Sequence, residues 1–253
     1  MQAEKYYRQS SYVGDQLAAD AGAVKNLVLA VFAGLLVMLI GMRVLPETST
    51  PLLVKVMGLL SASVALGAVG AYVGRNLSGW LAIIGTIIGM FALIFIIPMF
   101  GGGVLGTGLL MGFGFLGGMT LGPLVSFALA EAGPGIVVQS LTGTTAIMLI
   151  AGIVTLTTGI NFSFLGPIYL IALLGLIVVG LIGIFVRFSR GVSLLYSLIG
   201  IVVFSLGFLY KFWRLAQDEN TWDAAVRHTM SLYLGFINLF SFILQFLLTS
   251  RRR

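Results

Sequence analysis

The sequence predicts an all-α, polytopic integral membrane protein, and three features of its composition support this fold class. Hydrophobic residues make up 59% of the 253-residue chain, charged residues only 9%, and the mean hydropathy is +1.10. Between Val56 and Val186 the only charged side chains are Arg75 and Glu131. A soluble domain needs a largely polar or charged surface, whereas a charge at the centre of a bilayer costs roughly 2.5–3.5 kcal/mol. We therefore expect several membrane-spanning helices joined by short loops.

The chain begins with a polar segment and then becomes almost continuously apolar. Residues 1–26 are mixed in charge, and we interpret them as a terminal segment with a short interfacial helix around Asp15–Lys25. A helix needs about 20 apolar residues to cross about 30 Å of hydrocarbon. The chain ends in a basic tail at 250–253. Between these ends we predict eight spans, at 27–45, 54–74, 80–100, 105–130, 136–157, 165–187, 192–212 and 229–249.

The fourth predicted span is long and rich in glycine. Gly114, Gly118 and Gly122 follow one another at four-residue intervals. Such small-xxx-small spacing lets two helices approach closely in lipid, and we interpret these glycines as a packing face. The alternative interpretation is a flexible gate. Because a proline removes a backbone N–H and clashes with the preceding turn, we also expect a kink or a break at Gly122–Pro123.

The basic residues that flank the spans predict the orientation of the chain. With eight helices, both termini and the even-numbered loops lie on one side, which collects nine Lys and Arg residues against five on the other. The positive-inside rule then places both termini in the cytoplasm, and we expect a bacterial inner (cytoplasmic) membrane location. The longest predicted loop, 213–228, holds Asp218, Glu219 and Asp223. We interpret it as a solvated polar loop, and a cation site there is the alternative.

The rarer residue types exclude several classes of function. The chain has no cysteine, which excludes disulfides, thiol catalysis and cysteine-ligated metals. Its single histidine, His228, leaves no histidine-based metal site, and a Ser–His pair would need this residue at the wet start of the last predicted span. The Lys and Arg residues lie at span ends and termini, where they meet lipid headgroups. We therefore expect no enzymatic activity, no cofactor and no nucleic-acid partner.

Three stretches carry a resemblance to a known family. They are GGMTLGPLVSFAL (117–129), LTGTTAIMLIAGIVTLTTGINFSFLGPIYL (141–170) and SLYLGFINLF (231–240). In this order they resemble the third helix, the fourth and fifth helices, and the closing helix of the Bax inhibitor-1 (transmembrane Bax inhibitor motif) family, closest to its bacterial YccA-like branch. The resemblance implies a seven-helix membrane domain, which maps onto 54–249. The helix at 27–45 is then an N-terminal addition.

The resemblance also shows which family residues this chain lacks. Several relatives are pH-sensitive calcium leaks that use a pair of aspartates on the sixth and seventh helices of the family core. Here those positions fall on Lys211 and Gly235. Carboxylate oxygens suit calcium, and two neighbouring acids titrate as a pair, whereas a lysine repels a cation. We expect this sensor to be absent.

Some polar side chains remain inside the predicted spans. Thr144, Thr145 and Asn238 are the clearest examples, and Asn238 lies on the same helical face as Gly235. Interhelical hydrogen bonding is the simpler interpretation, and a polar pore lining is the alternative.

These features favour a non-enzymatic membrane protein that modulates or binds other membrane proteins. YccA-like relatives associate with the membrane protease FtsH, so the resemblance implies an FtsH-type assembly as a partner. A packing subunit of a larger membrane complex fits the same residues. The alternative is a calcium or proton leak channel, which the lost acids at Lys211 and Gly235 disfavour.

Overall fold

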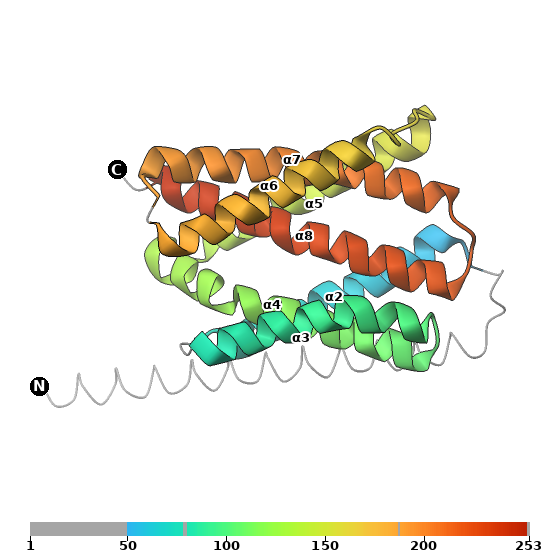
Figure 1. Ribbon diagram of the computed structural model, residues 1–253, viewed down its shortest axis with the longest axis horizontal. Coiled ribbons are helices and arrows are strands. Elements are labelled where there is room, and N and C mark those ends of the chain that lie inside the picture. Colours follow the sequence, from blue (N-terminus) through green and yellow to red (C-terminus); the bar gives the residue numbers. More distant parts are fainter. Residues whose placement is uncertain (1–49, 78–79, 187, 252–253) are drawn as a thin grey trace, which may run out of the picture. The chain divides into compact units, whose positions relative to one another are not determined.

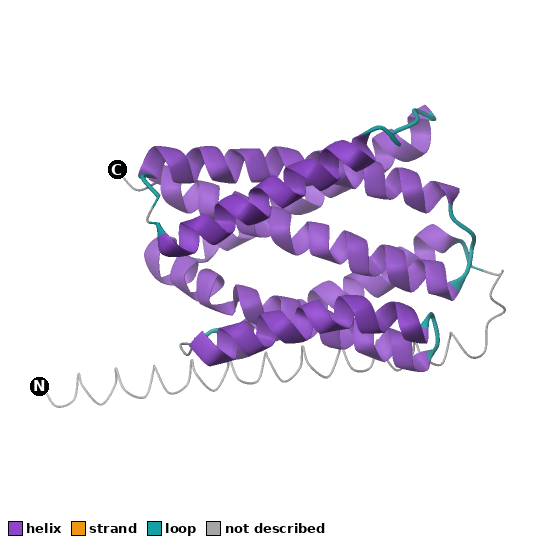
Figure 2. Ribbon diagram, viewed as in Figure 1, coloured by secondary structure: helices purple, strands orange, loops and turns teal. Residues whose placement is uncertain are grey.

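The computed structural model describes residues 50–77, 80–186 and 188–251, and the secondary structure of these ranges is entirely α-helical (Figures 1 and 2). Successive helices run in opposite directions and are joined by short loops. Their bounds are α2 (Leu52–Gly74), α3 (Trp80–Phe100), α4 (Val104–Ala132), α5 (Pro134–Thr158), α6 (Leu165–Phe185), α7 (Arg190–Gln217) and α8 (Trp222–Arg251).

The predicted all-α membrane fold is confirmed, but the count of eight spans is not supported. The described residues hold seven helices, and the segments expected at 1–26 and 27–45 lie outside them. Six of the seven are long and apolar enough to cross a membrane by length and composition, and the apolar stretch described in α3 covers Thr86–Phe100. At about 1.5 Å per residue, helices of 21 to 30 residues reach roughly 30–45 Å, enough for the hydrocarbon core.

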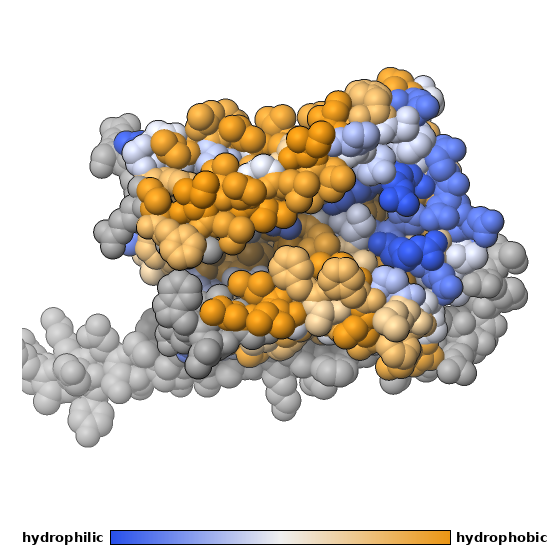
Figure 3. Space-filling view, in the orientation of Figure 1, coloured by the Kyte–Doolittle hydropathy of each residue, from blue (hydrophilic) through white to orange (hydrophobic). Residues whose placement is uncertain are grey.

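The outward faces of the helices are apolar. Figure 3 shows hydrophobic side chains over α3 and α6, and polar side chains gathered at the end of the bundle where α7 is joined to α8. Phe95 on α3, Ile171 on α6 and Phe185 at the end of α6 are each more than 70% exposed. An apolar surface of this extent is stable only in contact with lipid or with another apolar protein surface.

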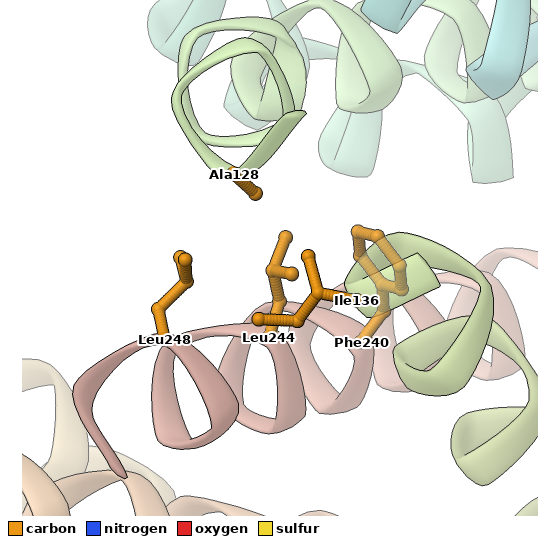
Figure 4. Close-up of a cluster of buried hydrophobic side chains, with 5 residues drawn as sticks. All are labelled: Ala128, Ile136, Phe240, Leu244 and Leu248. Atoms are coloured by element: carbon orange, nitrogen blue, oxygen red, sulfur yellow. The ribbon is translucent and has the colours of Figure 1, made fainter. Parts of the chain in front are cut away.

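Helix α8 is the central helix of the described bundle. It packs against α2, α3, α4, α5 and α7, so it meets more of the described helices than any other helix does. One of its buried clusters joins the end of α4 to the start of α5 through Ala128, Ile136, Phe240, Leu244 and Leu248 (Figure 4). The turn between α4 and α5 is closed by Gly133, whose φ of 74° favours a residue without a side chain.

The closest helix contact joins α2 to α4 through glycines. A Cβ added at Gly118 would lie 1.8 Å from the carbonyl oxygen of Gly67, and one added at Gly70 would lie 2.0 Å from that of Phe115. Gly122 meets Gly74 in the same way. This contact supports the packing interpretation of Gly114, Gly118 and Gly122. Helix α4 continues through Pro123, so a break at Gly122–Pro123 is wrong, whereas the kink expected there as the alternative stays a prediction.

The predicted long loop at 213–228 is also wrong. Helix α7 continues to Gln217 and α8 begins at Trp222, which leaves only four connecting residues, 218–221. The Thr221 hydroxyl accepts a hydrogen bond from the backbone N–H of Ala224 (3.1 Å), as a helix N-cap does. Asp223 accepts a hydrogen bond from the backbone N–H of Gly102, which ties this turn to the start of α4. Polar residues in the first and last turns of helices obscured the helix ends in the sequence.

We predict that Gly118→Ala destabilises the protein, because the new methyl group would overlap the α2 backbone, and overpacking of this kind costs about 1–3 kcal/mol. Gly112→Ala is the matched control on α4, since a Cβ there meets nothing within 4 Å. That control should be neutral or stabilising, because alanine has the higher helix propensity. Thermal unfolding in detergent measures both. Equal melting temperatures for the two variants would contradict close packing at Gly118.

Candidate functional site

The side chain of Lys211 is buried inside the bundle. It extends from α7, is only 8% exposed, and donates a hydrogen bond from Nζ to the backbone carbonyl of Ser231 on α8 (2.9 Å). The Ser231 carbonyl is already in a helical position to accept a bond from within α8, so the lysine adds a second donor to it. The amine thus joins the later part of α7 to the first half of α8.

Gly235 makes this reach of the lysine possible. It lies one helical turn after Ser231, and a Cβ at this position would be 2.7 Å from Lys211 Nζ. The same Cβ would lie 3.1 Å from Phe208 Cε1. The structure therefore brings together the two residues that the sequence singled out, Lys211 and Gly235. The amine of Lys211 occupies the space that a side chain at position 235 would fill.

Aromatic rings complete the surroundings of the amine. Its Nζ lies 5.2 Å from the ring centroid of Tyr169 on α6 and 5.7 Å from that of Phe208. Tyr169 reaches this position over Gly207, where a Cβ would lie 2.5 Å from the ring. Rings at these distances favour a cation over a neutral group. In the part of the chain that the structure describes, Lys211 makes no ion pair with a carboxylate.

These contacts decide what the site can do chemically. Calcium and other hard cations bind carboxylate and carbonyl oxygens. At this site the one carbonyl is taken by the lysine, and neither protonation state of an amine supplies a negative charge. Across the described residues no group of three or more His, Cys, Asp or Glu side chains could hold a metal ion. The arrangement is suited to holding helices together and lacks the oxygen ligands that a calcium ion needs.

The remaining polar residues singled out from the sequence are scattered. Thr144 is fully buried and donates to the Ser140 carbonyl of its own helix (2.8 Å). Thr145, the next residue on α5, is exposed on the outer surface. Asn238 is half-buried and donates from Nδ2 to the Leu234 carbonyl on α8 (2.7 Å). The hydrogen bonds of Thr144 and Asn238 each stay within one helix, and Thr145 lies apart from them.

A polar group that the sequence analysis missed lies at the turn between α7 and α8. His228 Nε2 and Asp218 Oδ2 are 2.9 Å apart, and Arg227 lies 3.5 Å from the same oxygen. Burial alone would raise the pKa of the Asp218 carboxyl, but the hydrogen bonds with His228 and the Glu219 backbone N–H, and the charge of Arg227, lower that pKa overall. Nothing in the sequence indicated that Asp218 and His228 would pair. They are ten residues apart, and the turn between α7 and α8 that brings them together was predicted as a long loop.

Buried Lys55 belongs to the same end of the bundle. Its side chain is 2% exposed, and Nζ lies 3.4 Å from the carbonyl oxygen of Asn220 and 5.0 Å from the centroid of the Trp222 ring. Asn220 in turn donates to the Thr50 carbonyl (3.0 Å). These bonds fasten the start of α2 to the short connection between α7 and α8.

Comparison with known proteins adds a family match. Residues 50–253 match the family model described as "Inhibitor of apoptosis-promoting Bax1". An uncharacterized protein of Helicobacter pylori strain J99 is 31% identical over 193 residues, which cover 73% of this chain and 80% of that protein. An uncharacterized membrane protein of Vibrio cholerae is 34% identical over 144 residues, covering 56% and 63%. A vaccinia virus (strain Lister) protein named Golgi anti-apoptotic protein is 34% identical over 145 residues, covering 57% and 59%.

We predict that Gly235→Ala destabilises the protein through Lys211. The added methyl group displaces the amine from the Ser231 carbonyl, and losing a buried hydrogen bond of this kind costs about 1–3 kcal/mol. In a Lys211→Met background the same substitution should cost about 1 kcal/mol less, because no amine remains to be displaced. A double-mutant cycle on melting temperature measures this coupling. Equal costs of Gly235→Ala in both backgrounds would show that the contact has no energetic weight.

We predict that the turn between α7 and α8 loses stability in acid. Because the pKa of Asp218 is lowered in the folded protein, its carboxylate stabilises the fold above its ordinary pKa of about 3.9, and this contribution disappears as the pH falls through the folded-state value. Asp218→Asn should lower the melting temperature at pH 7, and the gap to the unmodified protein should narrow below about pH 4. Glu219→Gln, at the exposed neighbouring acid, is the control. A gap independent of pH would refute this role of the carboxylate.

Proposed function

The chain belongs to the Bax inhibitor-1 family, and from this premise we propose that it is a non-enzymatic membrane protein that acts by binding other membrane proteins. The match over residues 50–253 confirms the resemblance of the three sequence stretches to this family. That it is an integral membrane protein follows from its apolar helices and from the membrane relative in Vibrio cholerae. The mode of action is the new element of the proposal.

The observation that carries the proposal is the contact between Lys211 and Gly235. The resemblance places the two carboxylates of a cation-sensing pair at these positions. In this protein the amine of Lys211 fills the space beside Gly235 and donates a hydrogen bond to the α8 backbone. Such a site repels or ignores a cation, so a gate that opens by protonation of an acid pair has no counterpart here. The scaffold without the sensor favours a role in protein contacts over a role in conduction.

The surface of the bundle offers faces for such contacts. Helix α6 is the least buried of the candidate spans, and its outer side chains include Ile171, Leu174 and Val178, each more than half exposed. This face can meet lipid or a neighbouring transmembrane helix. An FtsH-type protease assembly and a larger membrane complex are the partners we propose. Either partner would pack against these apolar faces, and lipid would cover the part of the surface that the partner does not contact.

The location that fits these contacts is the bacterial inner membrane, with both termini in the cytoplasm. Arg190 donates to the carbonyl oxygen of Ser250 (3.0 Å), and Arg251 donates to Gln139 (2.9 Å). Arg75, at the end of α2, lies at the same end of the bundle as the turn between α4 and α5. In the described part of the chain this end holds three arginines and the other end holds Lys55, Lys211, Arg214 and Arg227, so the proposed cytoplasmic position of this end rests on the nine-to-five count of basic residues in the whole sequence.

We predict that the full chain, extracted in mild detergent, co-purifies with an FtsH-type protease or runs at the mass of a larger assembly. Native mass measurement separates these two outcomes from a lone protein. The same chain in proteoliposomes should pass calcium and protons no faster than empty vesicles. The reference for conduction is the Lys211→Asp, Gly235→Asp double variant, in which removing the lysine makes room for the second acid.

Two results would overturn the proposed function. A chain that migrates alone and captures no FtsH-type assembly would remove the protein-contact role. A native chain that conducts as well as the double variant would show that Lys211 does not prevent ion passage. Size and folding of each variant are checked first by gel filtration, so that loss of fold is not counted as loss of flux.

A further inference from the structure

A half-enclosed apolar groove opens between α2, α4, α5 and α8. Its volume is about 410 Å³, within the range of about 300–1,000 Å³ that small-molecule sites occupy. Apolar side chains from all four helices line it, among them Ala71 of α2, Val125 of α4, Leu141 of α5 and Phe240 of α8. The groove lies apart from Lys211, whose side chain is not among its lining residues.

Small residues on α2 make the groove hollow. Gly67, Ala68 and Ala71 form one of its walls, and none of them has a side chain long enough to fill the space in front of it. Across from them, Leu129 of α4 and Leu141 of α5 are more than 40% exposed, whereas Phe240 of α8 is buried beneath. Among the described residues, the interior is therefore both apolar and reachable from outside the bundle. In a membrane, the molecules that reach it first are lipid chains.

A single charged side chain stands at the edge of this groove. Arg75 follows the last turn of α2 and is exposed, and its guanidinium carbon lies 4.0 Å from the centroid of the Tyr72 ring. Stacking on Tyr72 holds the plane of the guanidinium in place. Within the described part of the chain this guanidinium makes no hydrogen bond or ion pair, so its N–H donors remain free for a ligand.

We propose that this groove binds an anionic phospholipid, with one acyl chain between α2 and α5 and the headgroup phosphate on Arg75. Arginine presents paired N–H donors that match the geometry of a phosphate. Its place at the end of α2, beside the turn between α4 and α5, is the level at which headgroups lie. The apolar interior accepts a hydrocarbon chain and no polar group of comparable length. This inference goes beyond the proposed function and does not depend on it.

The test uses the full chain in vesicles that contain a phosphatidylglycerol with a photoreactive diazirine on one acyl chain. After illumination, mass spectrometry maps the attached lipid. We expect adducts on peptides that contain Ala71, Leu141 or Phe240, and about tenfold fewer when the same probe carries a phosphatidylcholine headgroup, a difference of about 1.4 kcal/mol. Arg75→Gln should bring the two headgroups to equal labelling. Arg190→Gln, at the same end of the bundle, is the matched control and should keep the preference for phosphatidylglycerol.

A second pair of variants tests the interior of the groove. Ala71→Phe fills it and should reduce groove labelling about tenfold. Ala146→Phe adds the same side chain to the exposed face of α5 and should leave groove labelling unchanged. Labelling spread evenly over α5 and α6, or headgroup preference unaltered by Arg75→Gln, would overturn the proposal. A dimer of the native chain that Ala71→Phe dissociates would also overturn it, because a second copy would then occupy the groove.

Discussion

The contact of the α2 backbone with the α4 backbone is the constraint on which the rest of the bundle depends. Lipid tails are as apolar as leucine, so no hydrophobic force drives membrane helices together, and close packing must do so. Where Gly67 meets Gly118 the two helices touch backbone to backbone. Tyr233 of α8 lies over this junction, and its hydroxyl donates to the Gly114 carbonyl (2.6 Å). The central helix is thereby attached to the pair.

Helix α8 transmits this constraint to the other half of the bundle. Tyr233 faces α2 and α4, whereas Gly235, two residues later, faces Phe208 and Lys211 of α7. Phe240 then packs with Ile136 of α5. Each of these contacts uses a different side of one helix, so the position of α8 sets both the space around the lysine and one wall of the apolar groove.

Several features could be predicted because they depend on local composition. The order of the spans from α2 to α8 follows from hydrophobic runs of about 20 residues, and the packing role of Gly118 follows from its spacing. The replacement of two expected acids by Lys211 and Gly235 followed from the family resemblance. The pairing of Asp218 with His228 and the groove edge at Arg75 were not visible, because each depends on where a helix ends or on which helices meet across it.

By itself, the sequence determined that this chain lies in a membrane as a bundle of apolar helices, because a run of residues with almost no charge is stable nowhere else. Its resemblance to the family also places Lys211 and Gly235 where an acid pair is expected. Only the tertiary structure decided that the lysine amine enters the gap at Gly235 and bonds to α8. Hydropathy measures how a residue partitions between water and lipid, whereas the partner of a side chain depends on the approach of helices distant in the chain.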